Sequence, residues 1–300
     1  MFMQQLINGL ALGAVYALIA LGYTMVYGIL QLINFAHGEV YMLGAYLGII
    51  VLGILTALGL PAYSLPLTIF ITLGLSMLFC AAYGATIERI AYRPLRGASR
   101  LAPLISAVGM SIILQNIVML LQGKEYKYLP PVISFEGYAL FGARISPVEI
   151  FILGASILLM LGLQLFISRT KMGKAMRATA QDRIMAGLTG VNINRVIGVT
   201  FMIGSALAAV AGVMVTLSYG VVHFFMGYTA GLKAFTAAVL GGIGSIPGAM
   251  LGGFMLGIIE NFGASYISSV YKDAFAFVVL ILTLIIRPSG LIGPRELDKV

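Results

Sequence analysis

Residues 147–195 read PVEIFILGASILLMLGLQLFISRTKMGKAMRATAQDRIMAGLTGVNINR. Residues 147–167 carry a single charged side chain, Glu149, and are long enough for a helix to cross a bilayer, which takes about 20 apolar residues. Residues 168–195 are the most polar segment of similar length in the chain, and Asp182 is their only acid. Because basic loops of membrane proteins stay in the cytoplasm, the pattern predicts a membrane helix that ends on the cytoplasmic side.

The composition extends this pattern to the whole chain. Hydrophobic residues make up 60% of the sequence and charged residues 9%, whereas a soluble domain carries about 25% charged residues. The apolar runs are about 20 residues long, which excludes the ten-residue alternating segments of a membrane barrel. The sequence therefore predicts an all-α, polytopic helical membrane protein with about eight spans in one transmembrane domain, residues 1–300. The expected spans are roughly 6–29, 40–59, 63–87, 101–121, 147–167, 196–217, a broken region 231–262, and 273–286.

The net charge of +8 does not indicate nucleic-acid binding, because the basic residues lie in short loops between apolar spans. Three clusters hold 13 of the 18 lysines and arginines: Arg89, Arg93, Arg96 and Arg100; Arg169, Lys171, Lys174, Arg177, Arg183 and Arg195; and Arg287, Arg295 and Lys299. We place all three clusters in the cytoplasm. Segments 122–146 and 218–230 then lie outside, and 231–262 must cross an even number of times or form a re-entrant hairpin.

Glycine and proline interrupt the region 231–262, and both disfavour helix interiors. Irregular backbone at membrane depth is tolerated where it is buried in protein or lines a watery cavity. We therefore expect a broken or re-entrant segment that supplies pathway or gate residues, namely Gly241, Gly242, Gly244 and Pro247. For any one glycine, close helix packing is the alternative. The segment 38–44 echoes 231–242, but the identity is too weak to establish an inverted repeat.

Asn34, His37 and Glu39 form a second polar interruption between two apolar spans. Ionisable groups within membranes are costly and often functional, so these residues are candidates for a break near the pathway or the cytoplasmic gate. The alternative is a short polar turn at the membrane surface. Lys233 and Glu260 are expected at the membrane interface, where water reaches them.

The basic loop 168–195 has room for one or two short helices outside the bilayer. Asp182 is a candidate N-cap and Gly190 a candidate terminator of the second helix. The middle of this helix would expose a small apolar patch inside a basic rim, with Met185, Ala186 and Leu188 as buried contacts for a partner and Arg183 as a rim charge. We interpret 182–190 as a docking surface.

Signals for catalysis are absent from the sequence. The Gly-Lys pairs at 123–124 and 173–174 are not followed by Ser or Thr, so no phosphate-binding loop is present. His37, His223 and Cys80 are isolated, which predicts no metal site and no cofactor. If the chain transports actively, its energy must come from an ion gradient or from a separate ATPase subunit, and the elaborate basic loop 168–195 favours a separate ATPase with this chain as a non-catalytic subunit. A proton-coupled secondary transporter that uses Glu39 or Glu260, and a passive channel, are the alternatives.

Five segments together resemble a known family. They are LINGLALGAVYALIALGYTMVYGI, INFAHGEVYMLGAY, APLISAVGMSIILQN, MGKAMRATAQDRIMAGLTGVNINRV and GLKAFTAAVLGGIGSIPGAMLGG, which begin at residues 6, 33, 102, 172 and 231. In this order and spacing the chain resembles the LivH-type permease of bacterial branched-chain amino-acid ABC importers, over essentially its whole length.

The resemblance implies a location in the bacterial inner membrane, among lipids, and four kinds of interaction. A related LivM-type permease would complete the pathway, two cytoplasmic ATPase subunits would drive it, and an extracytoplasmic binding protein would deliver leucine, isoleucine or valine. The loop 168–195 would be the coupling element that docks on an ATPase, with the short helix at Asp182 to Gly190. Related permeases serve urea, short amides or other amino acids, so these substrates remain alternatives.

Overall fold

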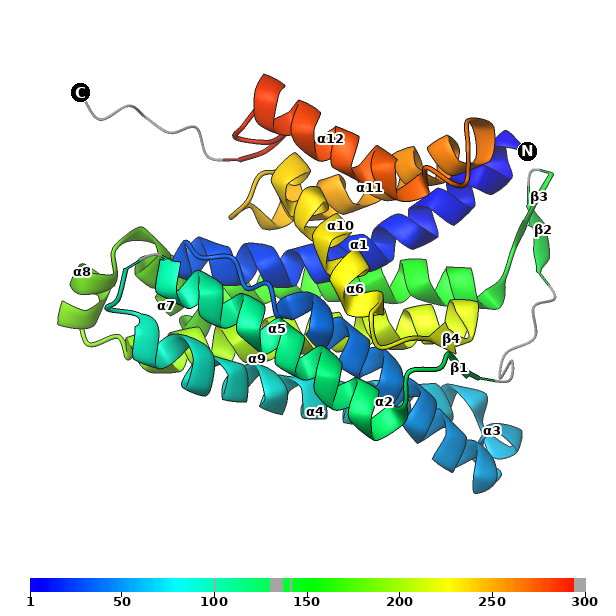
Figure 1. Ribbon diagram of the computed structural model, residues 1–300, viewed down its shortest axis with the longest axis horizontal. Coiled ribbons are helices and arrows are strands. Elements are labelled where there is room, and N and C mark those ends of the chain that lie inside the picture. The colour runs from blue at the N-terminus through cyan, green and yellow to red at the C-terminus, as the bar shows by residue number, and fades with distance from the viewer. Residues whose placement is uncertain (100, 130–136, 141, 294–300) are drawn as a thin grey trace.

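The structure is a computed structural model that describes residues 1–99, 101–129, 137–140 and 142–293 (Figure 1). Long helices dominate it, as predicted, and two small two-stranded ribbons, β1 with β4 and β2 with β3, join them. The elements are α1 Phe2–Leu30, α2 His37–Ala57, α3 Leu60–Tyr63, α4 Leu65–Ile87, α5 Leu101–Gln122, β1 Lys127–Tyr128, β2 Tyr138–Leu140, β3 Ala143–Ile145, α6 Pro147–Arg169, α7 Lys171–Gln181, α8 Arg183–Leu188, α9 Ile193–Tyr219, β4 Val221–Val222, α10 Met226–Gly241, α11 Ile246–Tyr266 and α12 Lys272–Ile286.

Seven helices in the described part of the chain are long and apolar enough to cross a membrane: α1, α2, α4 with its continuation to Leu95, α5, α6, α9 and α11. The helices α10 and α12 are shorter, at 16 and 15 residues. This arrangement confirms an all-α, multi-pass membrane protein whose span count is close to the predicted eight.

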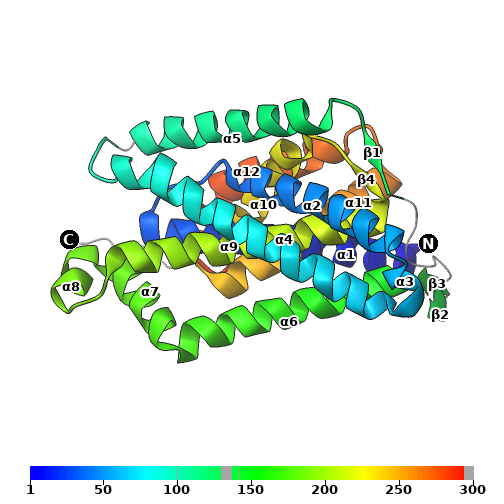
Figure 2. The ribbon, with the colours of Figure 1, turned by 90° about the horizontal axis from the view of Figure 1, so that it is seen from below.

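The core lies along α1 and α9, which bury most of their length. Close packing of α1 on α11 depends on glycine, because a Cβ on Gly9 would lie 3.0 Å from the Cα of Ile258 and a Cβ on Gly13 would lie 2.7 Å from the Cα of Phe254. Figure 2 shows α5 and α6 on opposite flanks, and both expose most of their apolar side chains. Such faces suit contact with lipid or with another membrane subunit.

The first polar interruption is a break deep within the membrane region. Helix α1 ends at Leu30, Gln31 adopts a left-handed conformation (φ 53°), and the chain doubles back so that α2 begins beside the middle of α1 (Figure 1). The Nε2 atom of His37 lies 3.2 Å from the carbonyl oxygen of Ile19. Ile19 precedes the end of α1 by eleven residues, or about 16 Å at 1.5 Å per residue, so α2 does not begin at the membrane surface.

The loop between α9 and α10 repeats the hydrogen bonds of this break. The amides of His37 and Met226 donate to the carbonyl oxygens of Asn34 and His223, at 3.0 and 3.1 Å. One residue earlier, the amide of Ala36 donates to Asn34 Oδ1 and that of Phe225 to His223 Nδ1, at 3.1 and 3.2 Å. The backbone thus takes the same local form at two places far apart in the sequence.

The two breaks, one before α2 and one before α10, contact each other through glycine residues. A Cβ added to Gly38 would collide with the carbonyl oxygen of Gly227, and a Cβ on Gly231 would lie 3.0 Å from the Cα of Gly38. In the shared hydrogen-bond pattern Gly38 and Gly227 take the same place, one residue after His37 and Met226 respectively.

The region 231–262 is not one straight helix, as predicted. Helix α10 ends at Gly241, and α11 begins at Ile246 with Pro247 in its first turn, where proline is tolerated. Gly242 (φ 104°) and Gly244 (φ 94°) have backbone angles that residues with a Cβ rarely adopt. The amides of Leu291 and Ile292 donate to the carbonyls of Leu240 and Gly241, both at 2.9 Å. The segment that follows α12 therefore folds back onto the break between α10 and α11.

Candidate functional site

The segment 182–190 forms the expected short helix at one extremity of the molecule (Figure 1). Asp182 is its N-cap, because its Oδ1 atom accepts hydrogen bonds from the amides of Ile184 at 2.8 Å and Met185 at 3.0 Å. Gly190 follows the helix with φ 87° and so ends it, as predicted. The local sequence signals thus fix both ends of α8.

Helix α8 presents an apolar face that the rest of the described chain leaves uncovered. Ile184, Met185 and Leu188 are 75%, 59% and 76% exposed. The expectation that Ala186 shares this face is wrong, because Ala186 is 4% exposed and lies on the side of the helix that packs against the protein. Helix periodicity separates it from Ile184 and Leu188, which are four residues apart and share a face.

Arg183 does not stand free at the rim of this patch. Its Nε and Nη2 atoms donate to the carbonyl oxygen of Ile29, at 3.1 and 2.6 Å, and so bind one of the last carbonyls of α1. Burial lowers the pKa of the Arg183 guanidinium, but arginine remains protonated at neutral pH. Arg183 therefore ties the start of α8 to the end of α1, next to the break that leads into α2.

The three basic segments lie at this same end. A cavity of about 1340 Å³ is bordered by Arg96 and Ala98, by residues 179–184, and by Pro288 and Ser289. Arg96 pairs with Glu88 and donates to Asn194 Oδ1 at 2.6 Å. Arg100, Arg295 and Lys299 lie outside the described residues. A common end for the described parts of all three clusters fits the expected common side of the membrane.

The polar trio at the first break is buried in protein. Asn34, His37 and Glu39 are 3%, 1% and 1% exposed, so they do not form a polar turn that water covers. Asn34 Oδ1 accepts from the Tyr92 hydroxyl at 3.0 Å. Glu39 Oε1 accepts hydrogen bonds from α5, at 3.1 Å from Ser111 Oγ and 2.7 Å from Gln115 Nε2. A role in the pathway or gate stays a prediction.

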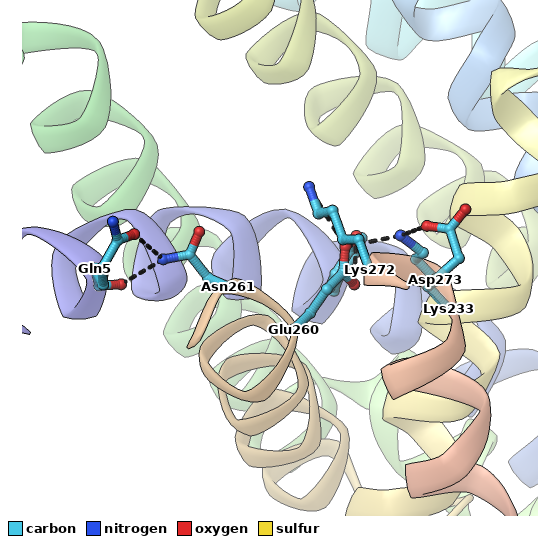
Figure 3. A network of polar contacts seen from close by, with 7 residues as sticks. Gln5, Lys233, Glu260, Asn261, Lys272 and Asp273 are labelled. Atoms are coloured by element: carbon cyan, nitrogen blue, oxygen red, sulfur yellow. Dashed lines mark hydrogen bonds and ion pairs between the residues drawn. The ribbon is translucent and has the colours of Figure 1, made fainter. Parts of the chain in front are cut away.

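A buried charge network was missed by the sequence reasoning (Figure 3). Glu260 is 0% exposed and Lys233 5%, so the expectation of solvated interface residues is wrong for both. Lys233 Nζ lies 2.7 Å from Glu260 Oε1 and 2.6 Å from Asp273 Oδ1. The Tyr16 hydroxyl lies 3.1 and 3.0 Å from the two Glu260 oxygens. One lysine and one acid in neighbouring apolar helices were the available signal, because buried charges within membranes pair with each other.

These features define a multi-pass helical membrane protein. Comparison with known proteins then gives its family. The sequence profile described as "Branched-chain amino acid transport system / permease component" matches residues 5–284. The chain therefore belongs to this family of permease components.

The similar proteins cover the chain from end to end. It is 52% identical to the high-affinity branched-chain amino acid transport system permease protein BraD of Pseudomonas aeruginosa, over 100% of this chain and 98% of BraD. It is 49% identical to the permease protein LivH of Escherichia coli, with the same coverage. A probable LivH of Methanocaldococcus jannaschii is 30% identical over 92% of this chain and 88% of that protein. No solved structure matches the chain.

Proposed function

We propose that this chain is a transmembrane permease subunit of an ATP-driven importer for branched-chain amino acids in a bacterial inner membrane. The observation that carries the proposal is the identity of about one half, over full length, to permease proteins named for high-affinity branched-chain amino acid transport. Residues 1–300 act as one non-catalytic permease domain. Its partners are a second, LivM-type permease, two ATPase subunits and an extracytoplasmic binding protein.

The form of α8 supports a separate motor. Ile184, Met185 and Leu188 are large apolar side chains exposed beyond the basic end of the helical bundle. Apolar anchors that become buried in a partner supply most of the binding energy of an interface. We propose that this face inserts into a groove of an ATPase subunit, with Asp182 and Gly190 fixing the ends of the helix. Ala186 and Arg183 hold α8 on the permease rather than contacting the ATPase.

The ion pair of Glu260 favours ATP over a proton gradient as the energy source. Glu260 is held by Lys233 and Tyr16, and a carboxylate paired in this way is poorly placed to load and release protons. Glu39 is hydrogen-bonded to two side chains of α5. The pairing of Glu260 therefore argues against its use as a proton carrier, whereas the Oε2 atom of Glu39 is buried without a hydrogen-bond partner in the described part of the chain.

Transport by the complete complex in proteoliposomes tests the proposal. The chain is purified with its co-expressed permease and ATPase partners, and labelled leucine, isoleucine and valine are supplied on the binding protein. We expect uptake that requires ATP on the ATPase side and persists when the proton gradient is collapsed. Uptake without ATP, or uptake of urea or acetamide in preference to leucine, would contradict the proposal.

A further inference from the structure

A cavity of about 340 Å³ opens at the end of the molecule opposite α8, among the ends of α1, α6, α9, α11 and α12. Leu12 of α1 is a partly exposed apolar side chain in the lining, whereas Val15, Ile152 and Val215 are buried and offer the cavity little surface. Glu149 and Lys272 line the same cavity and bring opposite charges to it. Uncharged polar side chains from Asn8, Ser218, Tyr219 and Asn261 complete the lining, which is therefore about as polar as it is apolar. About 300 Å³ is the lower end of the volume range of ligand cavities.

Glu149 carries a negative charge at the N-terminus of α6 that no cationic side chain pairs with in the described ranges. Its Oε2 atom accepts from the Ser146 amide at 2.7 Å and from the Ser146 hydroxyl at 3.0 Å, in a capping box at the start of α6. These bonds fix the side chain. The amide nitrogen of Asn8, oriented toward α6, lies 3.2 Å from the other oxygen, Oε1. Within the described ranges Glu149 forms no ion pair, so its charge is open to a cation.

Lys272 carries a positive charge that is only partly engaged. Its Nζ atom lies 3.5 Å from Glu260 Oε1, whereas Lys233 lies at 2.7 Å from the same oxygen (Figure 3). Because Glu260 has this closer counter-ion and the Tyr16 hydroxyl as well, it leaves most of the donor capacity of Lys272 free. An ammonium so placed suits a carboxylate.

The geometry points to a binding site for an α-amino acid zwitterion, and this inference rests on the proposed function. The α-ammonium binds Glu149, the α-carboxylate binds Lys272, and an aliphatic side chain lies against Leu12. A ligand with both charges satisfies both walls at once, whereas an amine or a carboxylic acid satisfies only one. The site lies on the side where an extracytoplasmic binding protein would release its substrate.

Direct binding of labelled L-leucine to the complete permease–ATPase complex in nanodiscs, without binding protein, tests the site. We expect saturable binding that Glu149→Gln and Lys272→Met each weaken about tenfold or more, in keeping with hydrogen bonds to charged groups. Glutamine at 149 preserves the capping box, and Lys233 and Tyr16 still hold Glu260 when Lys272 is replaced. Lys124→Gln, an exposed change on the outer loop, should bind leucine like the wild type.

Leucine analogues separate recognition of charge from a structural effect. In wild type, 4-methylpentanoate lacks the ammonium and should compete far less well than leucine. Glu149→Gln should shrink that difference, because the group that reads the ammonium is gone. Ser218→Phe, which fills the cavity without altering a charge, should abolish leucine binding in a complex that still assembles.

Two possible results distinguish failure of the proposed binding site from failure of the proposed function. If wild-type complex imports leucine while Glu149→Gln, Lys272→Met and Ser218→Phe all bind and import it normally, the cavity is a solvent-filled vestibule and the inference is overturned. If the wild-type complex with its binding protein imports no branched-chain amino acid, the proposed function fails and the inference fails with it.

Discussion

At the α8 end of the molecule, apolar side chains are exposed and Arg96 and Arg183 are engaged by the chain itself. At the opposite end, charged side chains line a small cavity. Ile184 and Leu188 project outward while Arg183 binds the end of α1. Glu149 and Lys272 line the cavity of about 340 Å³ at the opposite end. An exposed apolar helix suits a protein partner, and a small charged cavity suits a small molecule. The proposed function accounts for the difference with a motor at one end and substrate entry at the other.

The largest expected effect is all-or-none labelling that distinguishes the two ends. A cysteine at Ser269, an exposed position just before α12, should react in intact cells with a thiol reagent that cannot cross the membrane. A cysteine at Ser99, exposed at the α8 end, should react only after the cells are opened. The native Cys80 is buried and gives no background. Labelling of Ser99→Cys from outside would reverse the assignment of the two ends.

The next effect concerns the charge network that supports the outer end. Lys233→Met leaves Glu260 buried without its nearest cation, and breaking a buried ion pair in this way costs about 3–5 kcal/mol. We expect a large drop in the thermal unfolding temperature of the purified complex, monitored by its monodisperse fraction.

Replacing both members of the pair is the matched control. Lys233→Met with Glu260→Gln leaves no unpaired charge between these two residues, so it should recover most of the lost stability. A double variant as unstable as Lys233→Met alone would mean that packing, rather than the unpaired charge of Glu260, causes the loss.

The smallest effect lies at the α8 end. Asp182→Ala removes the side chain that caps the amides of Ile184 and Met185, and loss of an N-cap costs about 1 kcal/mol. In a helix of six residues this is enough to increase fraying. Hydrogen exchange of the α8 amides should rise in Asp182→Ala and stay unchanged in Asp182→Asn, since asparagine also caps. Equal exchange in both variants and in wild type would show that the Asp182 cap does not stabilise α8.

Local signals in the sequence predicted the α8 end well. The cap at Asp182, the terminator at Gly190 and the break before Pro247 each depend on residues close together in the chain. The face to which Ala186 belongs was mispredicted, because the packing of so short a helix depends on what lies beneath it. Arg183 illustrates the same limit, since its partner Ile29 is far away in the sequence.

The other features depend on contacts between residues far apart in the sequence, and sequence reasoning could not predict those contacts. The sequence contains Lys233 and Glu260, but only the packing of α10 against α11 places them within 2.7 Å. The meeting of Gly38 with Gly227 likewise joins two halves whose sequence identity is low. Residues from five helices line the cavity that contains Glu149 and Lys272, so no single segment of the sequence could indicate it.

The central claim is that α8 docks in a groove of an ATPase subunit, and the Leu188→Glu variant tests this claim most directly. Leu188 is 76% exposed, so the change should leave the permease pair intact. If Leu188 is buried in the complex, a carboxylate there should cost about 2 kcal/mol or more, which is about thirtyfold in affinity. Ser99→Glu, at an exposed position of the same end, is the control. We predict that Leu188→Glu co-purifies with little ATPase and imports no leucine, whereas full ATPase retention with normal ATP-driven uptake would contradict the account.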